Sequence, residues 1–486
     1  MEKWNSGNIR LKQVNETLWE IPKTGGMRVP GRIYASRKMM DGIEQDQSLQ
    51  QVANVAHLPG IVKYSLAMPD IHWGYGFPIG GVCATHRDDG VVSPGGVGYD
   101  INCGVRLIGT SLTAEQVRPR IRALVSNLFK HVPTGVGASK AIPRLSQAEL
   151  RSVATDGARW AVEHGFGTTA QLDRIEEHGC LAGADTQAVD ERPWQRGADQ
   201  LGTLGSGNHF LEIGVVEEIY HDTAARTFGL HKGGIVAMIH CGSRGFGYQV
   251  CDDYLKVTLH ATEKYGISIP DRQLACAPIN SGEGRAYLGA MRCAANYAFA
   301  NRQVIMHLAE QSFMETFALS QRELGFNLIY DICHNIAKFE THEVDGKKID
   351  VCMHRKGATR AFGPGNENIP VEYRGVGQPV LIPGDMGRYS FLCVGTDRAM
   401  KETFGSSCHG AGRHMSRKKA MAESKGHDMI RELHDRGVEI QATGMRTIAE
   451  EMPHAYKDVA DVVNVMHDAG ITLKVAKFKP LGVIKG

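Results

Sequence analysis

Residues 95–106 (GGVGYDINCGVR) constrain the fold more than any other stretch of the chain. Glycines on both sides of Val97 allow backbone conformations that other residues disfavour, so we expect a tight loop. Within this loop, Asp100 and Cys103 place a carboxylate and a thiol three residues apart. Thiolate is a strong ligand for zinc, and carboxylate extends the choice towards manganese or iron. The pair can bind one divalent cation or two adjacent ones. A buried cysteine beside a turn aspartate is the alternative interpretation.

Four histidines in similar small-residue contexts strengthen the metal interpretation. His209 lies in GTLGSGNHFLE, His240 in AMIHCGSRG, His334 in YDICHN and His409 in SSCHGAGR. Histidine is the commonest protein metal ligand, and its partners need not be near in sequence. The sequence therefore offers enough ligands for a metal centre that the fold would have to assemble.

A second segment rich in glycine and proline, residues 68–81 (MPDIHWGYGFPIGG), is predicted to be a positioned loop. Asp70 and His72 lie two apart, which places them on one face if the backbone is extended. Two interpretations remain open here. The pair forms an Asp–His hydrogen bond inside a buried turn, or it supports the neighbouring centre or its substrate.

Composition limits the class of protein. The chain has 486 residues, of which 42% are hydrophobic and 22% charged, and its net charge is +2. Such a balance excludes a bulk polycation, so nucleic acid would have to bind through a local basic patch. The 11 cysteines contain no CxxC pair, which argues against a zinc ribbon. The N-terminal sequence lacks the apolar core of a signal peptide, and no apolar stretch of about 18 residues predicts a membrane span. We expect a reduced, cytoplasmic, enzyme-sized protein.

Hydrophobic periodicity predicts an α+β fold, with mixed β-sheets flanked by helices in a single domain over residues 1–486. The predicted strands cover residues 18–21, 105–111, 210–216, 236–240, 326–333, 379–382 and 472–484. The predicted helices cover residues 46–57, 113–130, 147–163, 285–319, 413–436 and 459–467. The helix over 285–319 is interpreted as a buried structural helix. Residues 176–193 are expected to be a surface excursion, and residues 354–356 a loop of three cations.

Residues 406–417 (SSCHGAGRHMSR) predict a phosphate-binding cradle, made by Gly410, Gly412, a helix N-terminus and Arg413. An ordinary helix cap with a solvated arginine is the alternative. Lys485, one residue from the end of the chain, would on position alone be a solvated tail lysine.

Taken in order, seven motifs resemble those of the RtcB family of RNA ligases: DINCGVR, GSGNHFLE, IHCGSRG, CHN, HRKGATR, PGDMG and HGAGR. MPDIHWGYGFPIGG and the C-terminal PLGVIKG also match, so the resemblance spans nearly the whole chain. It implies an enzyme that uses GTP and two Mn²⁺ ions to join RNA 3′-phosphate or 2′,3′-cyclic phosphate ends to 5′-hydroxyl ends. The implied intermediates are a covalent histidine–GMP adduct and an RNA-3′-pp-G end. The substrates would be tRNA halves or broken RNA ends, in tRNA splicing or RNA repair. Archease would be an activating partner of a monomeric enzyme.

The resemblance also implies roles for individual residues. Asp100, Cys103 and His209 would bind one manganese ion, and Cys103, His240 and His334 the other, with Cys103 as the bridge. His409 would be the nucleophile that becomes guanylylated. The implied GTP-binding residues are Asn208, His209, Glu212, His334, Asn335, Pro383, Gly384, Asp385, Met386, Ser390, His409, Gly410, Ala411, Gly412 and Lys485. The implied RNA-phosphate contacts are Arg196, Arg244, Lys356, Arg413 and Arg417. Cys241 is a departure, because the resemblance leads us to expect a small hydroxyl residue there.

Three other functions compete with this interpretation. A dinuclear metal-dependent phosphodiesterase would use the same metal ligands, but it would not need a separate histidine in a glycine-rich cradle. A non-catalytic RNA-binding protein would show a basic excess or an aromatic-rich RNA motif. A redox iron enzyme would explain the ligands but not the phosphate-binding motifs.

Overall fold

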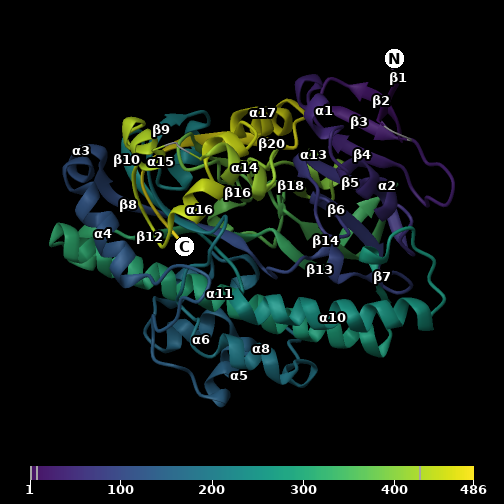
Figure 1. Cartoon of the computed structure of the whole chain (residues 1–486), viewed down its shortest axis with the longest axis horizontal. Helices are drawn as coiled ribbons and strands as arrows, with labels where there is room; N and C mark the ends of the chain where they lie inside the picture. The colour runs from purple at the N-terminus through teal and green to yellow at the C-terminus, as the bar shows by residue number, and fades with distance from the viewer. Residues whose placement is uncertain (1–2, 7–8, 426–427) are drawn as a thin grey trace.

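The computed structural model describes residues 3–6, 9–425 and 428–486, and its architecture is α+β, as predicted. Two large sheets form the body of the molecule (Figure 1). The first sheet has the order β1 (Lys3–Ser6), β2 (Ile9–Asn15), β3 (Leu18–Ile21), β4 (Gly31–Tyr34), β5 (Ile61–His72), β6 (Ile79–His86), β14 (Lys347–Lys356), β13 (Asn335–Val344). Only β4 and β5 pair in parallel within this sheet, over the residues described.

The second sheet holds the strands that matter most for the candidate site. Its order is β12 (Asn327–Cys333), β8 (Gly104–Thr113), β10 (Gly234–Cys241), β9 (Phe210–Ile219), β20 (Thr472–Lys485), β17 (Ser390–Gly395), β16 (Pro379–Ile382), and β19 (Glu439–Ala442) joins β20. The last strand of the chain thus lies inside the sheet, between β9 and β17. The chain passes from one sheet to the other at His334, because β12 ends at Cys333 and β13 begins at Asn335.

One long helix packs against this sheet, and a second long helix packs along the first. α11 (Gly282–Phe317) packs along α10 (Arg244–Lys264) and against β10, and the shorter helices α4 (Ile121–His131), α5 (Gln147–Asp156), α6 (Ala158–Glu163) and α8 (Glu191–Gly197) flank the pair (Figure 1). Gly247 of α10 faces Ala294 of α11, and a Cβ at Gly247 would meet that methyl group at an ordinary contact distance of 3.4 Å but would collide with the Ser243 hydroxyl. Phe246 and Tyr297 stack across the same interface with ring centroids 5.2 Å apart. None of the described helices is long and apolar enough to cross a membrane.

The predicted strands are present, but three predicted helices are broken. The helix predicted over 113–130 is α3 (Ala114–Val117) and α4, because Pro119 lies in a 3-10 turn between them. The helix over 147–163 is interrupted at Gly157, whose φ of 59° ends α5. The helix over 413–436 is α14 (Arg417–Glu423) and α15 (Met429–Asp435), and residues 426–427 of that range lie outside the described chain.

Three loop predictions were also wrong. Residues 354–356 belong to β14, where Arg355 forms a buried ion pair with Glu340. Of the loop predicted over residues 68–81, residues 68–72 continue β5 and residues 79–81 begin β6, so only residues 73–78 form a loop. The stretch after residue 176 is not simply a surface excursion, because the Glu176 carboxylate is buried against the ammonium of Lys338. In each case the sequence shows polar residues but not the partner that allows them to be buried.

Candidate metal and nucleotide site

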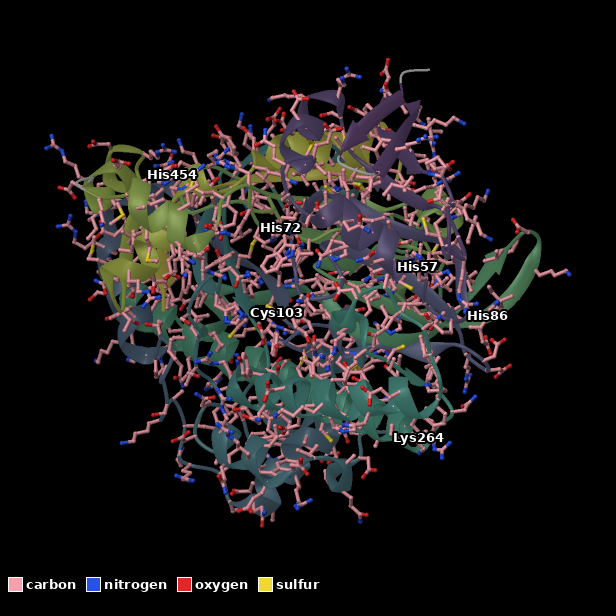
Figure 2. All side chains as sticks on the ribbon, turned by 45° about the vertical axis from the view of Figure 1, so that its right-hand side comes forward. His57, His72, His86, Cys103, Lys264 and His454 are labelled. Atoms are coloured by element: carbon pink, nitrogen blue, oxygen red, sulfur yellow. The ribbon has the colours of Figure 1, made fainter. Side chains whose placement is uncertain are left out.

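The predicted metal ligands lie at the ends of neighbouring strands of the second sheet. Cys103 immediately precedes β8, His209 immediately precedes β9, and His240 is the penultimate residue of β10. β10 pairs with both β8 and β9, and His240 is in register with Val105 and Phe210. His334 enters from the junction of β12 with β13. Figure 2 shows Cys103 near the centre of the molecule, whereas the labelled His86 and Lys264 lie towards its edge.

The donor atoms of these residues converge. The Cys103 Sγ atom lies 3.3 Å from the Nε2 atoms of both His209 and His240. His209 Nε2 is 2.8 Å from an Asp100 carboxylate oxygen, and His240 Nε2 is 3.3 Å from His334 Nε2. The atoms form two groups with mutual separations within 4.8 Å, Asp100–Cys103–His209 and Cys103–His240–His334, which share the thiol.

The chemistry of this donor set fits two divalent cations. Burial lowers the pKa of His240 and of His334 well below its usual value, which keeps both rings neutral, as metal ligation requires. Burial raises the pKa of the Cys103 thiol to about 12. A bound cation deprotonates such a thiol outright, because the positive charge compensates the buried thiolate. Imidazole, thiolate and carboxylate together suit borderline divalent metals.

The groups behind the ligands hold them in place. Asp100 directs its second oxygen to the backbone N–H of Ser243, which donates over 3.0 Å. Cys241 lies behind the metal cluster, with its Sγ atom 3.8 Å from His209 Nδ1 and 3.4 Å from the side-chain amide of Asn301. Cys241, the residue that departs from the pattern expected from the resemblance, therefore contacts Nδ1 of His209 and belongs to neither donor group.

The long helix α11 contributes polar support that the sequence interpretation missed. The Arg302 guanidinium donates to the carbonyl oxygens of Asn102 at 2.7 Å and Cys241 at 3.0 Å, one beside each ligand loop. Its charge is compensated by Asp331, whose carboxylate also binds Arg106, and all three side chains are fully buried. An arginine within a helix pattern of mostly apolar residues was the sequence feature that could have indicated this supporting role.

His409 follows β18 (Ser406–Cys408), which pairs with β15 (Ala358–Arg360). Its Nδ1 donates to a carboxylate oxygen of Asp70 at 2.6 Å, and the same oxygen accepts from the backbone N–H groups of His409 at 3.0 Å and Gly410 at 3.3 Å. Of the two interpretations of Asp70, the geometry favours a supporting role. With Nδ1 occupied, Nε2 is the nitrogen left for chemistry. The ring centroid of His409 lies 4.7 Å from that of His334.

A cavity of about 770 Å³ opens beside His409 and the metal ligands. The predicted nucleotide-binding residues on its wall are Asn208, Glu212, His334, Asn335, Pro383, Gly384, Asp385, Met386, His409, Gly410, Ala411, Gly412 and Lys485. His209, also predicted, is not among the wall residues. Ser390 lies behind the wall and donates its hydroxyl to Glu212 at 3.4 Å. The fold thus gathers residues from five separate motifs around one space.

A buried acidic side chain and a buried basic side chain line this cavity. Burial raises the pKa of Glu212 to about 8 and lowers the pKa of Lys485 to about 8. Lys485 is the last residue of β20, and its ammonium donates to the carbonyl oxygens of Gly207 at 2.7 Å and His209 at 3.3 Å. The solvated tail suggested by sequence position is therefore wrong for this residue.

Comparison with known proteins shows the family to which this chain belongs. The family model described as tRNA-splicing ligase RtcB matches residues 51–486. The chain belongs to the RtcB family. A curated relative from Thermococcus kodakarensis, named tRNA-splicing ligase RtcB, is 53% identical over 98% of this chain and 99% of its own length. Relatives of the same name from Archaeoglobus fulgidus and Nanoarchaeum equitans are 53% and 48% identical, over 98% and 99% of this chain and 99% and 100% of their own lengths.

The basic residues proposed from the RtcB resemblance are not gathered in one place. Lys356, Arg413 and Arg417 line the cavity, but Arg196 and Arg244 do not. The Arg244 guanidinium donates to a carbonyl oxygen of Gly135 at 2.9 Å, outside the cavity wall.

Each of the three cavity cations already has partners. Lys356 donates to the carbonyl oxygens of Tyr75, Phe77 and Gly95, and burial lowers its pKa to about 7. Arg413 and Arg417 each lie 3.3 Å from the Glu451 carboxylate. Helix α14 begins at Arg417, so the predicted cradle has no helix N-terminus at Arg413.

Aromatic side chains on the cavity wall were not predicted as site residues. They are Trp73, Tyr75, Tyr99, Phe210 and Tyr456. Most of them lie within or next to motifs already identified in this RtcB-family chain, and this position could have indicated that they belong to the site. An aromatic beside a glycine is equally common in protein cores, so the sequence did not distinguish the two uses.

Proposed function

We propose that this RtcB-family chain is a GTP- and Mn²⁺-dependent RNA ligase that joins RNA 3′-phosphate or 2′,3′-cyclic phosphate ends to 5′-hydroxyl ends. Its role would be tRNA splicing or the repair of broken RNA. The observation that carries the proposal is the Asp70–His409 pair, which presents a free imidazole nitrogen beside a double metal-ligand cluster in one cavity. We propose residues 1–486 as one catalytic unit, because the last strand lies inside the second sheet.

His409 supplies the nucleophile. The Asp70 carboxylate accepts a hydrogen bond from Nδ1–H, which keeps the proton on Nδ1. Nε2 therefore keeps its lone pair and attacks the α-phosphorus of GTP. An N–P bond forms and pyrophosphate leaves. An oxygen of the RNA 3′-phosphate then takes the GMP group, which releases the imidazole and gives an RNA-3′-pp-G end. The 5′-hydroxyl attacks the 3′-phosphorus, the phosphodiester forms and GMP leaves. A cyclic phosphate end is first opened by water.

The metal ligands are assigned in the same proposal. Asp100, Cys103 and His209 would hold one Mn²⁺, and Cys103, His240 and His334 the other. Two adjacent cations, when bound, neutralise phosphate charge and stabilise attacking and leaving oxygens. The shared thiolate of Cys103 keeps the two ligand groups at a fixed spacing.

Guanine recognition would fall on Glu212, whose carboxyl group, once ionised, would accept the N–H donors of the guanine edge. Lys485 is proposed to help position that base. The other nucleotide-binding residues keep the assignments given by the resemblance: Asn208, His209, His334, Asn335, Pro383, Gly384, Asp385, Met386, Ser390, His409, Gly410, Ala411 and Gly412. The RNA-phosphate roles of Arg196, Arg244, Lys356, Arg413 and Arg417 stay predictions.

The resemblance alone supplies RNA ends as the substrate and archease as an activator, and we propose both. We also propose a monomer, and a cytoplasmic setting that follows from the composition. Light scattering after size-exclusion chromatography measures the mass directly, and a dimer would contradict the monomer proposal. Multiple-turnover ligation with and without archease tests the activator.

Incubation with α-³²P-labelled GTP and Mn²⁺, followed by denaturing electrophoresis, tests the central step. We expect a covalent label that is acid-labile and survives alkali, as a phosphoramidate does. His409→Ala should keep both metals but form no adduct. The competing function is a dinuclear phosphodiesterase, which needs no covalent guanylate. An unlabelled wild-type protein that hydrolyses RNA phosphodiesters would favour that alternative, and a label that persists in His409→Ala would contradict the assignment of the nucleophile.

A further inference from the structure

A row of planar side chains runs from the cavity to the protein surface. Tyr75 and Tyr99 line the cavity, and their ring centroids are 5.9 Å apart at an interplanar angle of 69°. Tyr99 stacks on Tyr248 of α10, with centroids 4.9 Å apart and an angle of 25°. The Arg196 guanidinium of α8 lies over the Tyr248 ring, 5.2 Å from its centroid. These groups come from four separate segments of the chain.

Two large aromatic side chains are exposed at or next to the cavity. Trp73 lines the cavity and is 56% exposed, and Tyr248, which stacks on the wall residue Tyr99, is 47% exposed. A large aromatic side chain stabilises a fold mainly by being buried, so neither ring is explained by stability alone. Packing among the tyrosines accounts for Tyr75 and Tyr99, but it does not account for an indole left in solvent at a cavity wall.

The backbone that carries Trp73 is held firmly. Its N–H donates to the Asp46 carboxylate at 3.0 Å. The next residue, Gly74, is bound on both sides by the side-chain amide of Gln51 in α2 (Ser48–Val55), which donates at 2.6 Å and accepts at 3.1 Å. A fixed backbone under an exposed indole pre-organises a flat apolar surface, and pre-organisation lowers the entropic cost of binding.

Positive charge lies on the wall of the same cavity. Arg417 and Lys418 are both exposed and line it. Aromatic rings beside cations suit a single-stranded nucleic acid, whose bases stack while its phosphates are neutralised. Arg196 fits the same pattern, because a guanidinium plane can stack on a base as well as on a tyrosine.

We propose that Trp73, Tyr248 and Arg196 form a stacking surface for nucleobases of the unpaired RNA strand whose end enters the cavity. This inference rests on the proposed function and specifies its substrate class. Every base has a π-face, so such a surface accepts any sequence but requires unpaired nucleotides. Arg196 would then act through its plane, in contrast to the point-charge phosphate contact implied by the resemblance.

Fluorescence anisotropy of the full-length protein with a labelled single-stranded RNA that ends in a 3′-phosphate tests the surface. Trp73→Ala and Tyr248→Ala should each weaken binding roughly 5- to 150-fold, the range measured when aromatic stacking on a base is removed. Trp73→Phe and Tyr248→Phe should restore most of the affinity. Arg196→Lys keeps the charge but loses the plane, so stacking predicts weaker binding and a phosphate contact predicts retained binding.

Tyr265→Ala is the matched control. Tyr265 is 40% exposed and has Lys264 over its ring, but it does not line the cavity, so binding should not change. A second RNA that carries abasic sugars near its 3′ end separates stacking from general damage, because the effect of Trp73→Ala should vanish on it.

Two results would overturn the stacking surface. One is wild-type affinity in both alanine variants, and the other is an equal loss on the intact and abasic RNAs. Failure of the proposed function looks different, because the wild-type protein itself would then neither bind nor join RNA ends. Circular dichroism and urea unfolding of each variant confirm that the fold is retained.

Discussion

The substitution Asp70→Asn separates the positioning of His409 from the binding of metal. The same Asp70 oxygen accepts three hydrogen bonds, at 2.6 Å from the His409 ring and at 3.0 and 3.3 Å from the backbone N–H groups of His409 and Gly410. Asparagine keeps the shape but removes the charge. If its oxygen faces His409, its amide nitrogen occupies the place of the other carboxylate oxygen, which is buried and has no hydrogen-bond partner among the described residues. If its nitrogen faces His409, the ring must carry its proton on Nε2 and cannot attack.

The expected magnitude follows from these contacts. A hydrogen bond to a charged group contributes about 1.5–3 kcal/mol, compared with about 0.5–1.5 kcal/mol for a neutral one. Asp70→Asn removes the negative charge beside the His409 ring and leaves either a buried amide without a partner or the wrong histidine tautomer. Together these effects should raise the barrier to guanylylation by about 1.4–2.8 kcal/mol. The rate of guanylylation should then fall roughly 10- to 100-fold.

Single-turnover labelling with α-³²P-labelled GTP at saturating Mn²⁺ measures that rate, and elemental analysis measures the bound metal. Both metals should remain, since Asp70 belongs to neither ligand group. Asp461→Asn is the control, because this carboxylate pairs with Lys38 at 2.7 Å and does not line the cavity. Guanylylation within twofold of the wild type would refute the positioning role. A rate loss that only parallels a loss of metal would refute it equally.

Three further changes test other parts of the site. Cys103→Ala should abolish binding of both metals, because one sulfur serves both groups, and near-normal affinity for two Mn²⁺ ions would show that the thiolate is not a bridge. Burial raises the pKa of Glu212 from 4.5 to about 8, so the folded chain holds a proton that the unfolded chain has released. Stability should therefore decrease as pH rises from 4.5 to 8, and urea unfolding of Glu212→Gln should lack that part of the slope. Asp331→Ala leaves two buried guanidinium groups uncompensated, and calorimetry or urea unfolding should show a loss of about 3–5 kcal/mol, whereas a change below about 1 kcal/mol would contradict the ion-pair analysis.

The residues of the metal site could be named from the sequence, but their convergence could not be derived from it. The pattern around Asp100 and Cys103 alone favoured a buried cysteine beside a turn aspartate, and only the family resemblance assigned the ligand groups. The physical reason is distance along the chain. His209 and His240 reach Cys103 because β9, β10 and β8 are neighbours in a sheet whose strand order is not the chain order.

Most of the incorrect sequence predictions have one cause: the polar side chains concerned bind partners that are far away in the sequence and cannot be recognised from it. Lys356 was placed in a loop of three cations, yet it lies in a strand and is buried, because it donates to carbonyl oxygens as far as 281 residues away. Arg302 lies in the helix that was interpreted only as buried and structural, although it donates to both ligand loops. The break at Pro119 differs, since a proline inside a helical pattern is a local signal and could have been used.

The position of His334 explains why His409 and the metal-ligand groups belong to one structural unit. It joins β12, at one end of the strand order of the second sheet, to β13, at one end of the strand order of the first, and its own N–H donates to the Cys103 carbonyl oxygen at 2.9 Å. Asn335 extends this link, because its side chain donates to the Asp100 carbonyl oxygen and accepts from Gly357 N–H. A shift of one sheet relative to the other would therefore move His334 away from Cys103. The same shift would move His409, whose positioning partner Asp70 lies on β5 of the first sheet. The junction between the sheets thus sets the distance between the His409 imidazole and the two metal-ligand groups, and the proposed guanylylation would depend on that distance.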